Sequence, residues 1–231
     1  MIGQICGVSS LASPRRGAPV VTALTLALIA LAAPGVSQAG CGGTEIAYAH
    51  SHPRGQLPPL ALGDSTMLLS LPGLSAAGWT ANAHGCRTVR QALGILGHLR
   101  ARHQLPHMVA IALGSNGGLA SPDINEALRL ICCGRILVLV TPRELGGRSG
   151  RPAAIERAAA HAHHDRVLLL DWVADSVGHP EWFQPDRLHL TFRGVAAFNA
   201  LLAHALPYAY SPCPPKPARH AGSRADRVRP S

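Results

Sequence analysis

The chain contains 231 residues, of which 47% are hydrophobic, 14% charged and only 4% aromatic. This composition excludes a chain that is disordered throughout, because such chains combine few apolar residues with a high net charge. A polytopic membrane protein is also excluded, since only one apolar stretch, residues 20–33, approaches the length of a membrane span. The length suits one domain of ordinary size with a sizeable core.

The net charge of +9 is distributed unevenly along the chain. Residues 1–39 carry +2 and residues 211–231 carry +4, which leaves +3 for the middle. Because the basic character belongs mainly to the two ends, it does not predict a nucleic-acid partner.

Residues 1–39 have the pattern of an export signal. A pair of arginines precedes an apolar core at 20–33, and small residues at 37–39 form a cleavage site. We expect cleavage to release a mature chain that begins at Gly40 and lies outside the cytoplasm. Two alternatives are retention of the apolar run as a membrane anchor and attachment of a lipid at Cys41.

Residues 211–231 are rich in proline and arginine and show no apolar period. Such a segment cannot bury surface, so we expect a disordered basic tail. Contact with anionic polymers of the cell envelope and the absence of any role are both open for it.

Short aliphatic runs alternate with helical patterns between the two ends. Nearly continuous apolar runs are typical of parallel strands that are covered on both faces. The predicted strands are 57–62, 107–113, 135–140 and 167–172, with a weaker candidate at 78–83. The predicted helices are 88–103, 123–131, 152–163 and 193–206. This order predicts one doubly wound α/β domain over residues 40–210, with a central parallel sheet of about five strands.

The loops at the carboxyl ends of these strands carry the residues of an acyl-transfer site. Ser65 follows the first strand in a tight turn, where it would act as a nucleophile. His189 is the candidate base, and Asp186 lies three residues before it, close enough to orient the imidazole. The backbone N–H groups of Ser65 and Gly85 and the side-chain amide of Asn116 would stabilise an oxyanion.

Each of these residues also has a purely structural interpretation. Ser65 would be a helix N-cap, and Asn116 a turn residue beside glycines. Asp186 and His189 would cap the last helix. We favour a functional site because all of these residues lie at the same edge of the predicted sheet, in the loops where ligands of such folds bind.

The same positions resemble the four sequence blocks of the SGNH (GDSL-type) hydrolases. Gly-Asp-Ser at 63–65 matches the serine block and Gly85 the glycine block. Gly114-x-Asn116 matches the asparagine block, and Asp186-x-x-His189 the terminal block. The resemblance covers about residues 57–206.

This resemblance implies a flavodoxin-like three-layer α/β/α sandwich, and esterase, lipase-like or carbohydrate-deacetylase chemistry without a metal or other cofactor. It also implies a role for each matched residue. Ser65 would be the nucleophile, His189 the base and Asp186 its partner, with Ser65, Gly85 and Asn116 as the oxyanion hole.

Other residues favour simpler interpretations. The cluster His161, His163, His164 and Asp165 resembles metal ligands by composition, but a solvated cluster at a helix end is the favoured interpretation. Trp182 and Phe183 would wall a substrate pocket or, as we favour, pack in the core. Arg87 would grip an anionic substrate or, as we favour, lie on the surface at a helix start.

Five cysteines follow the export signal, an odd number that leaves at least one unpaired or paired between chains. The predicted fold places Cys41 and Cys213 at the edge of the sheet opposite the site. We therefore expect Cys41 to pair with Cys213, or either of them to pair with Cys132 or Cys133. Cys86, near the site, is expected to stay apart.

These observations predict a secreted serine esterase that acts through an acyl-enzyme on a small ester, such as an acetyl group on an envelope sugar or a lipid. Transfer of the acyl group to a sugar hydroxyl instead of water uses the same residues. The alternative is a non-catalytic domain that keeps the fold and binds the envelope. The mature protein is not expected to be an integral membrane protein, and its oligomeric state is open.

Overall fold

The computed structural model describes residues 41–132 and 134–211. The predicted export signal, Cys133, Cys213 and the predicted tail beyond residue 211 lie outside these residues.

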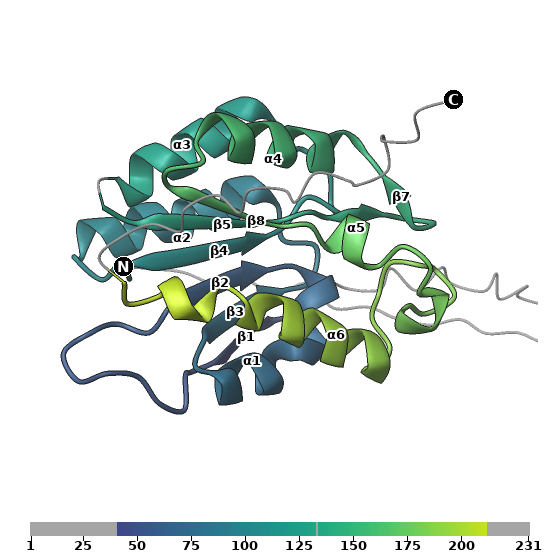
Figure 1. The fold of residues 1–231 in the computed structure, drawn as a ribbon, viewed down its shortest axis with the longest axis horizontal. Helices are drawn as coiled ribbons and strands as arrows, with labels where there is room; N and C mark the ends of the chain where they lie inside the picture. The colour runs from purple at the N-terminus through teal and green to yellow at the C-terminus, as the bar shows by residue number, and fades with distance from the viewer. Residues whose placement is uncertain (1–40, 133, 212–231) are drawn as a thin grey trace, which may run out of the picture. The chain divides into compact units, whose positions relative to one another are not determined.

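A six-stranded sheet with the order β1-β3-β2-β4-β5-β8 forms the centre of the domain (Figure 1). Five strands are parallel to one another, as predicted, and β1 runs antiparallel to β3 at one edge. The strands are β1 (Thr44–Ala47), β2 (Leu60–Gly63), β3 (Thr80–His84), β4 (Met108–Ala112), β5 (Ile136–Val140) and β8 (Val167–Leu170). Strand β1 was not predicted.

The four predicted helices are present, and shorter elements lie between them. The longer helices are α1 (Leu71–Ala77), α2 (Val89–Ala101), α3 (Ser121–Ile131), α4 (Arg151–Ala162) and α6 (Phe192–Ala203). The short elements are η1 (Ser65–Ser70), α5 (Trp172–Asp175), η2 (Pro180–Trp182), η3 (Leu206–Tyr208) and the hairpin of β6 (Arg143–Glu144) and β7 (Arg148–Ser149).

Helices cover both faces of the sheet, which confirms the three-layer sandwich (Figure 1). Helices α1 and α6 lie on one face, and α2, α3 and α4 lie on the other. The strands alternate accordingly: Ala110 and Val138 belong to the first core, while Val109 and Leu137 belong to the second. Because both faces are buried, both sets of alternating residues are apolar.

The chain reverses its direction of travel across the sheet around β2. From β2 it passes to β3 on one side, and it then returns to β4 on the other side of β2. In open α/β sheets, ligands bind at the carboxyl ends of the strands beside such a point. No helix in the described ranges has the length and apolarity needed to cross a membrane.

Candidate active site

Ser65 begins the 3₁₀ helix η1, directly beyond the end of β2. The turn between them requires glycine at position 63, because a Cβ there would lie 2.6 Å from the Cβ of Met67. Met67 is fully buried and cannot move away. The tight turn therefore holds Ser65 at the edge of the sheet.

The side chain of Asp64 stabilises this turn through hydrogen bonds. Its side chain is 1% exposed and caps η1 by accepting the Thr66 N–H at 3.0 Å. It also accepts the Thr66 hydroxyl at 2.7 Å and the Ser115 hydroxyl from the loop after β4. Neither Asp64 nor Ser115 was predicted to support the site, although an aspartate before a helix start is a capping signal.

Ser65, His189 and Asp186 are hydrogen-bonded in series. The Nδ1 atom of His189 lies 2.6 Å from Oδ2 of Asp186, and its Nε2 atom lies 3.0 Å from Oγ of Ser65. An ionised carboxylate only accepts, so the proton sits on Nδ1 and Nε2 accepts the Ser65 hydroxyl. This is the protonation pattern in which an imidazole takes a proton from serine.

The Asp186 carboxylate also shapes its own loop. Its Oδ1 atom accepts the backbone N–H groups of Leu188 at 2.9 Å and His189 at 3.0 Å. Burial raises the pKa of Asp186, but the bonds from the His189 ring and from these two N–H groups outweigh it, so the net pKa lies below its ordinary value. Asp186 is therefore a carboxylate at neutral pH.

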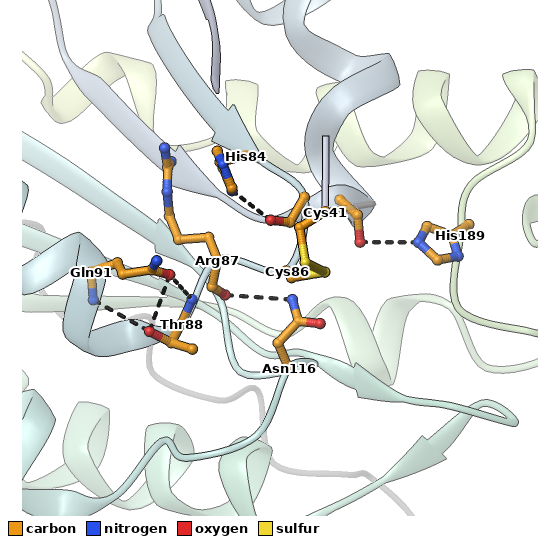
Figure 2. The surroundings of a disulfide bond; sticks show 10 residues. Cys41, His84, Cys86, Arg87, Thr88, Gln91, Asn116 and His189 are labelled. Atoms are coloured by element: carbon orange, nitrogen blue, oxygen red, sulfur yellow. Dashed lines mark hydrogen bonds between the residues drawn. A yellow bond between two sulfur atoms is a disulfide. The ribbon is translucent and has the colours of Figure 1, made fainter. Parts of the chain in front are cut away.

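The three expected oxyanion donors leave neighbouring strands at one edge. Gly63 pairs with Ala83 on β3, so Ser65 and Gly85, each two residues further on, continue the same register. Gly85 is buried, and Asn116 is exposed in the loop after β4. The Asn116 amide donates to the carbonyl of Arg87 at 3.4 Å, which joins the second and third loops (Figure 2).

The β6–β7 hairpin braces the loop that carries Asp186 and His189. The Gly146 N–H donates to the carbonyl of Asp186 at 3.0 Å. The guanidinium of Arg143 lies 4.3 Å from the centre of the Phe183 ring and donates to the carbonyl of Gly147 at 2.8 Å. This hairpin was not predicted, although two adjacent glycines between short polar segments are a hairpin signal.

Arg87 does not lie on the surface. It is 3% exposed, and its guanidinium donates to the carbonyl of Gly63 at 3.1 Å and to the carbonyl of Asn82 at 2.6 Å. The interpretation of Arg87 as a surface residue was therefore wrong, because its side chain ties the ends of β2 and β3 together. Phe183 is buried, and the ring of Trp182 stacks on that of Trp172 with 5.5 Å between the ring centres, as expected for core packing.

The predicted disulfide pairing was wrong. Cys41 pairs with Cys86, and their Cα atoms are 5.2 Å apart (Figure 2). The physical reason is strand β1, whose antiparallel register places Thr44 opposite His84 and brings Cys41 to the carboxyl end of β3. Cys86 therefore does not stay apart.

The histidine cluster lies far from this edge. His161 lies in the last turn of α4, and His163, His164 and Asp165 follow that helix in the loop before β8, at the amino edge of the sheet. Within the part of the chain that the structure describes, no three His, Cys, Asp or Glu side chains are grouped so as to hold a metal ion.

The sheet order and the layers match the fold of solved acylhydrolase and SGNH hydrolase structures, so the chain has the fold of the SGNH (GDSL-type) hydrolases. No family model matches the chain. A lipase/acylhydrolase from Enterococcus faecalis, 17% identical, has the same fold with a TM-score of 0.55 over 68% of this chain and 98% of that one.

The chain is also similar to peptidoglycan O-acetyltransferases. The C-terminal catalytic domain of OatA from Streptococcus pneumoniae is 25% identical, with a TM-score of 0.54 over 71% of this chain and 93% of that domain. YrhL of Bacillus subtilis, provisionally named a peptidoglycan O-acetyltransferase, is 31% identical over 151 residues, 64% of this chain and 23% of YrhL. The chain thus spans about a quarter of that curated relative.

Proposed function

We propose that this chain is a serine enzyme of the cell envelope that moves a small acyl group from an ester, through an acyl-enzyme on Ser65. In this proposal residues 1–39 direct export, residues 40–210 form the enzyme domain and residues 211–231 are a tail. The observation that carries the proposal is the hydrogen bond of 3.0 Å between Ser65 Oγ and His189 Nε2, which joins residues 124 positions apart.

The residues act in two half-reactions. Ser65 Oγ attacks the ester carbonyl while Nε2 of His189 takes its proton, and the carboxylate of Asp186 stabilises the resulting imidazolium. The N–H groups of Ser65 and Gly85 and the amide of Asn116 donate to the oxyanion. The intermediate collapses, the ester C–O bond breaks, and the leaving alcohol takes the proton from Nε2.

An acceptor hydroxyl completes the cycle. It gives its proton to Nε2 and attacks the acyl-enzyme, and Ser65 recovers the proton as it leaves. A sugar hydroxyl as acceptor makes the reaction a transfer, and water makes it a hydrolysis. We propose acetyl as the acyl group and an envelope glycan as the acceptor, because the chain is similar to peptidoglycan O-acetyltransferases along most of its length.

The test is active-site labelling combined with turnover of a short acyl nitrophenyl ester. A fluorophosphonate should modify Ser65 of the wild type, and Ser65→Ala should lose both labelling and turnover. The exposed serine Ser51 supplies a matched control, since Ser51→Ala should change neither. Wild-type protein that is folded but neither labels nor turns over would instead favour the non-catalytic envelope-binding domain.

The acceptor is identified in the same system. Incubation of the wild type with an acetyl ester and a soluble peptidoglycan-type oligosaccharide should yield an acetylated oligosaccharide, detected by mass spectrometry, that Ser65→Ala does not produce. If acetate is the sole product at high oligosaccharide concentration, the enzyme is an esterase and the proposed transfer is wrong.

A further inference from the structure

The Cys41–Cys86 disulfide lies beside the loop that carries Gly85. It joins Cys41, three residues before the edge strand β1, to the residue that follows Gly85, across 45 positions of sequence. Among the residues drawn around it in Figure 2 are Asn116 and His189, which come from two other loops of the site. The disulfide therefore lies beside the proposed oxyanion hole and not at a distant surface.

The backbone of Cys41 touches Gly85 directly. A Cβ at position 85 would lie 1.7 Å from the carbonyl oxygen of Cys41, so Gly85 is the only residue type that admits this approach. Cys86 itself has a φ of 56°, in the left-handed region that non-glycine residues rarely adopt. The conformation of residues 85 and 86 therefore depends on neighbours that hold it.

Several hydrogen bonds also hold this loop in place. The buried guanidinium of Arg87 holds the carbonyls of Gly63 and Asn82, and the Asn116 amide holds the carbonyl of Arg87. At the near end the His84 ring bonds to the carbonyl of Gly85. None of these bonds holds Cys41 against Gly85.

Strand β1 alone holds Cys41 next to Gly85 only weakly. Three of its four residues are exposed and the fourth is half-buried, so little apolar burial keeps it on β3. The disulfide holds Cys41, which precedes β1, against the backbone of Gly85. Breaking it leaves an edge strand that frays readily at its end.

We infer that the Cys41–Cys86 disulfide is a positioning element of the oxyanion hole, so that the turnover number of the enzyme depends on whether this bond is intact. The inference rests on the proposed function, because it assigns Gly85 as an oxyanion donor. Loss of one such donor lowers kcat by about 10²- to 10³-fold in a serine hydrolase. Partial displacement of Gly85 should lower kcat by roughly tenfold or more, with little change in KM.

The experiment measures kcat and KM for a short acyl ester before and after reduction. Dithiothreitol supplies two electrons and two protons, forms thiols at Cys41 and Cys86 and becomes a cyclic disulfide. Both cysteines are exposed, so the reagent has access. Alkylation and mass spectrometry then verify the state of each cysteine, and circular dichroism verifies the fold at the assay temperature.

Two variants make the result specific. Cys41→Ser should lower kcat as reduction does, and it leaves the strained residue Cys86 in place. The double variant Cys41→Ser with Cys86→Ser should show the same low kcat and no further response to dithiothreitol. Reoxidation of the reduced wild type should restore kcat.

The outcomes separate this inference from the proposed function. Reduced, folded enzyme that keeps kcat within twofold overturns the inference and leaves the proposed function intact. A loss of kcat that only follows loss of folded protein also overturns it, since the bond would then serve stability alone. Oxidised wild type without turnover that depends on Ser65 overturns the proposed function, and this inference with it.

Discussion

Replacement of Asp186 by asparagine would separate the geometry of the site from its protonation. Oδ1 of Asp186 accepts two backbone N–H groups, at 2.9 and 3.0 Å, and Oδ2 accepts the His189 ring at 2.6 Å. An asparagine keeps a carbonyl oxygen for the two N–H groups, so the loop should keep its shape. It places an NH₂ group where Oδ2 had accepted the ring proton.

That NH₂ group faces Nδ1 with a donor, so the ring should move its proton to Nε2. A protonated Nε2 cannot accept the hydroxyl proton of Ser65, and the imidazolium also loses its counter-charge. The same exchange in a serine protease lowers kcat by about 10⁴-fold. At about 1.4 kcal/mol per tenfold change, this corresponds to about 5.5 kcal/mol of transition-state stabilisation. We expect a loss of similar size here.

The assay is kcat and KM for a short acyl nitrophenyl ester, with the melting temperature measured in parallel. Asp186→Asn should lower kcat and leave KM and the fold nearly unchanged. Because the pKa of Asp186 lies below its ordinary value, its carboxylate persists into the acid range, and the wild-type advantage should be fully present at neutral pH. The exposed Asp175 provides the control, since Asp175→Asn makes the same chemical change outside the site. A folded Asp186→Asn variant within tenfold of the wild type would refute the reasoning.

Two further predictions concern parts of the fold that support the site. The variant Gly146→Pro loses the N–H that donates to the carbonyl of Asp186, and proline cannot adopt the φ of 80° found at this position, so kcat should fall about 10²-fold. The control is Gly55→Pro, which makes the same change at a φ of 78° in an open loop and should leave kcat unchanged. The pKa of Glu156 lies well above its ordinary value, mainly because the side chain is buried and secondly because the charge of Asp171 is near. Arg157 lowers this pKa by a smaller amount. The folded chain keeps a proton that the unfolded chain releases, so stability falls as pH rises above the ordinary pKa of glutamate. Glu156→Gln should therefore raise the melting temperature more at pH 8 than at pH 5, by roughly 2–4 °C for each kcal/mol gained in the free energy of unfolding. An equal change at both pH values would contradict this prediction.

Most of the fold was predictable because its strands are buried on both faces. A parallel strand covered on both sides needs apolar residues at every position, and β4 (Met108–Ala112), β5 (Ile136–Val140) and β8 (Val167–Leu170) have them within the predicted runs. Strand β1 has no such signal, since its sequence Thr-Glu-Ile-Ala is short and exposed. An edge strand is held by its ladder to one neighbour, and that neighbour is not visible in local sequence.

The candidate site was predictable to the extent that its residues follow strands. Ser65, Gly85 and Asn116 leave three neighbouring strands, so topology alone gathers them at one edge. The contacts that hold these residues in place join segments far apart in sequence. The bond from Ser115 to Asp64 spans 51 positions and that from Arg87 to Gly63 spans 24, and no local pattern encodes either.

The disulfide shows how one missed strand changes a conclusion about chemistry. With the first strand taken as parallel, everything upstream of it belongs to the amino edge of the sheet, and Cys41 lies about the length of a strand away from Gly85. An antiparallel β1 returns the chain to the carboxyl edge, and Cys41 then meets Cys86. The direction of a four-residue strand therefore decides whether the disulfide lies at a remote surface or beside the loop that is proposed to bind the oxyanion.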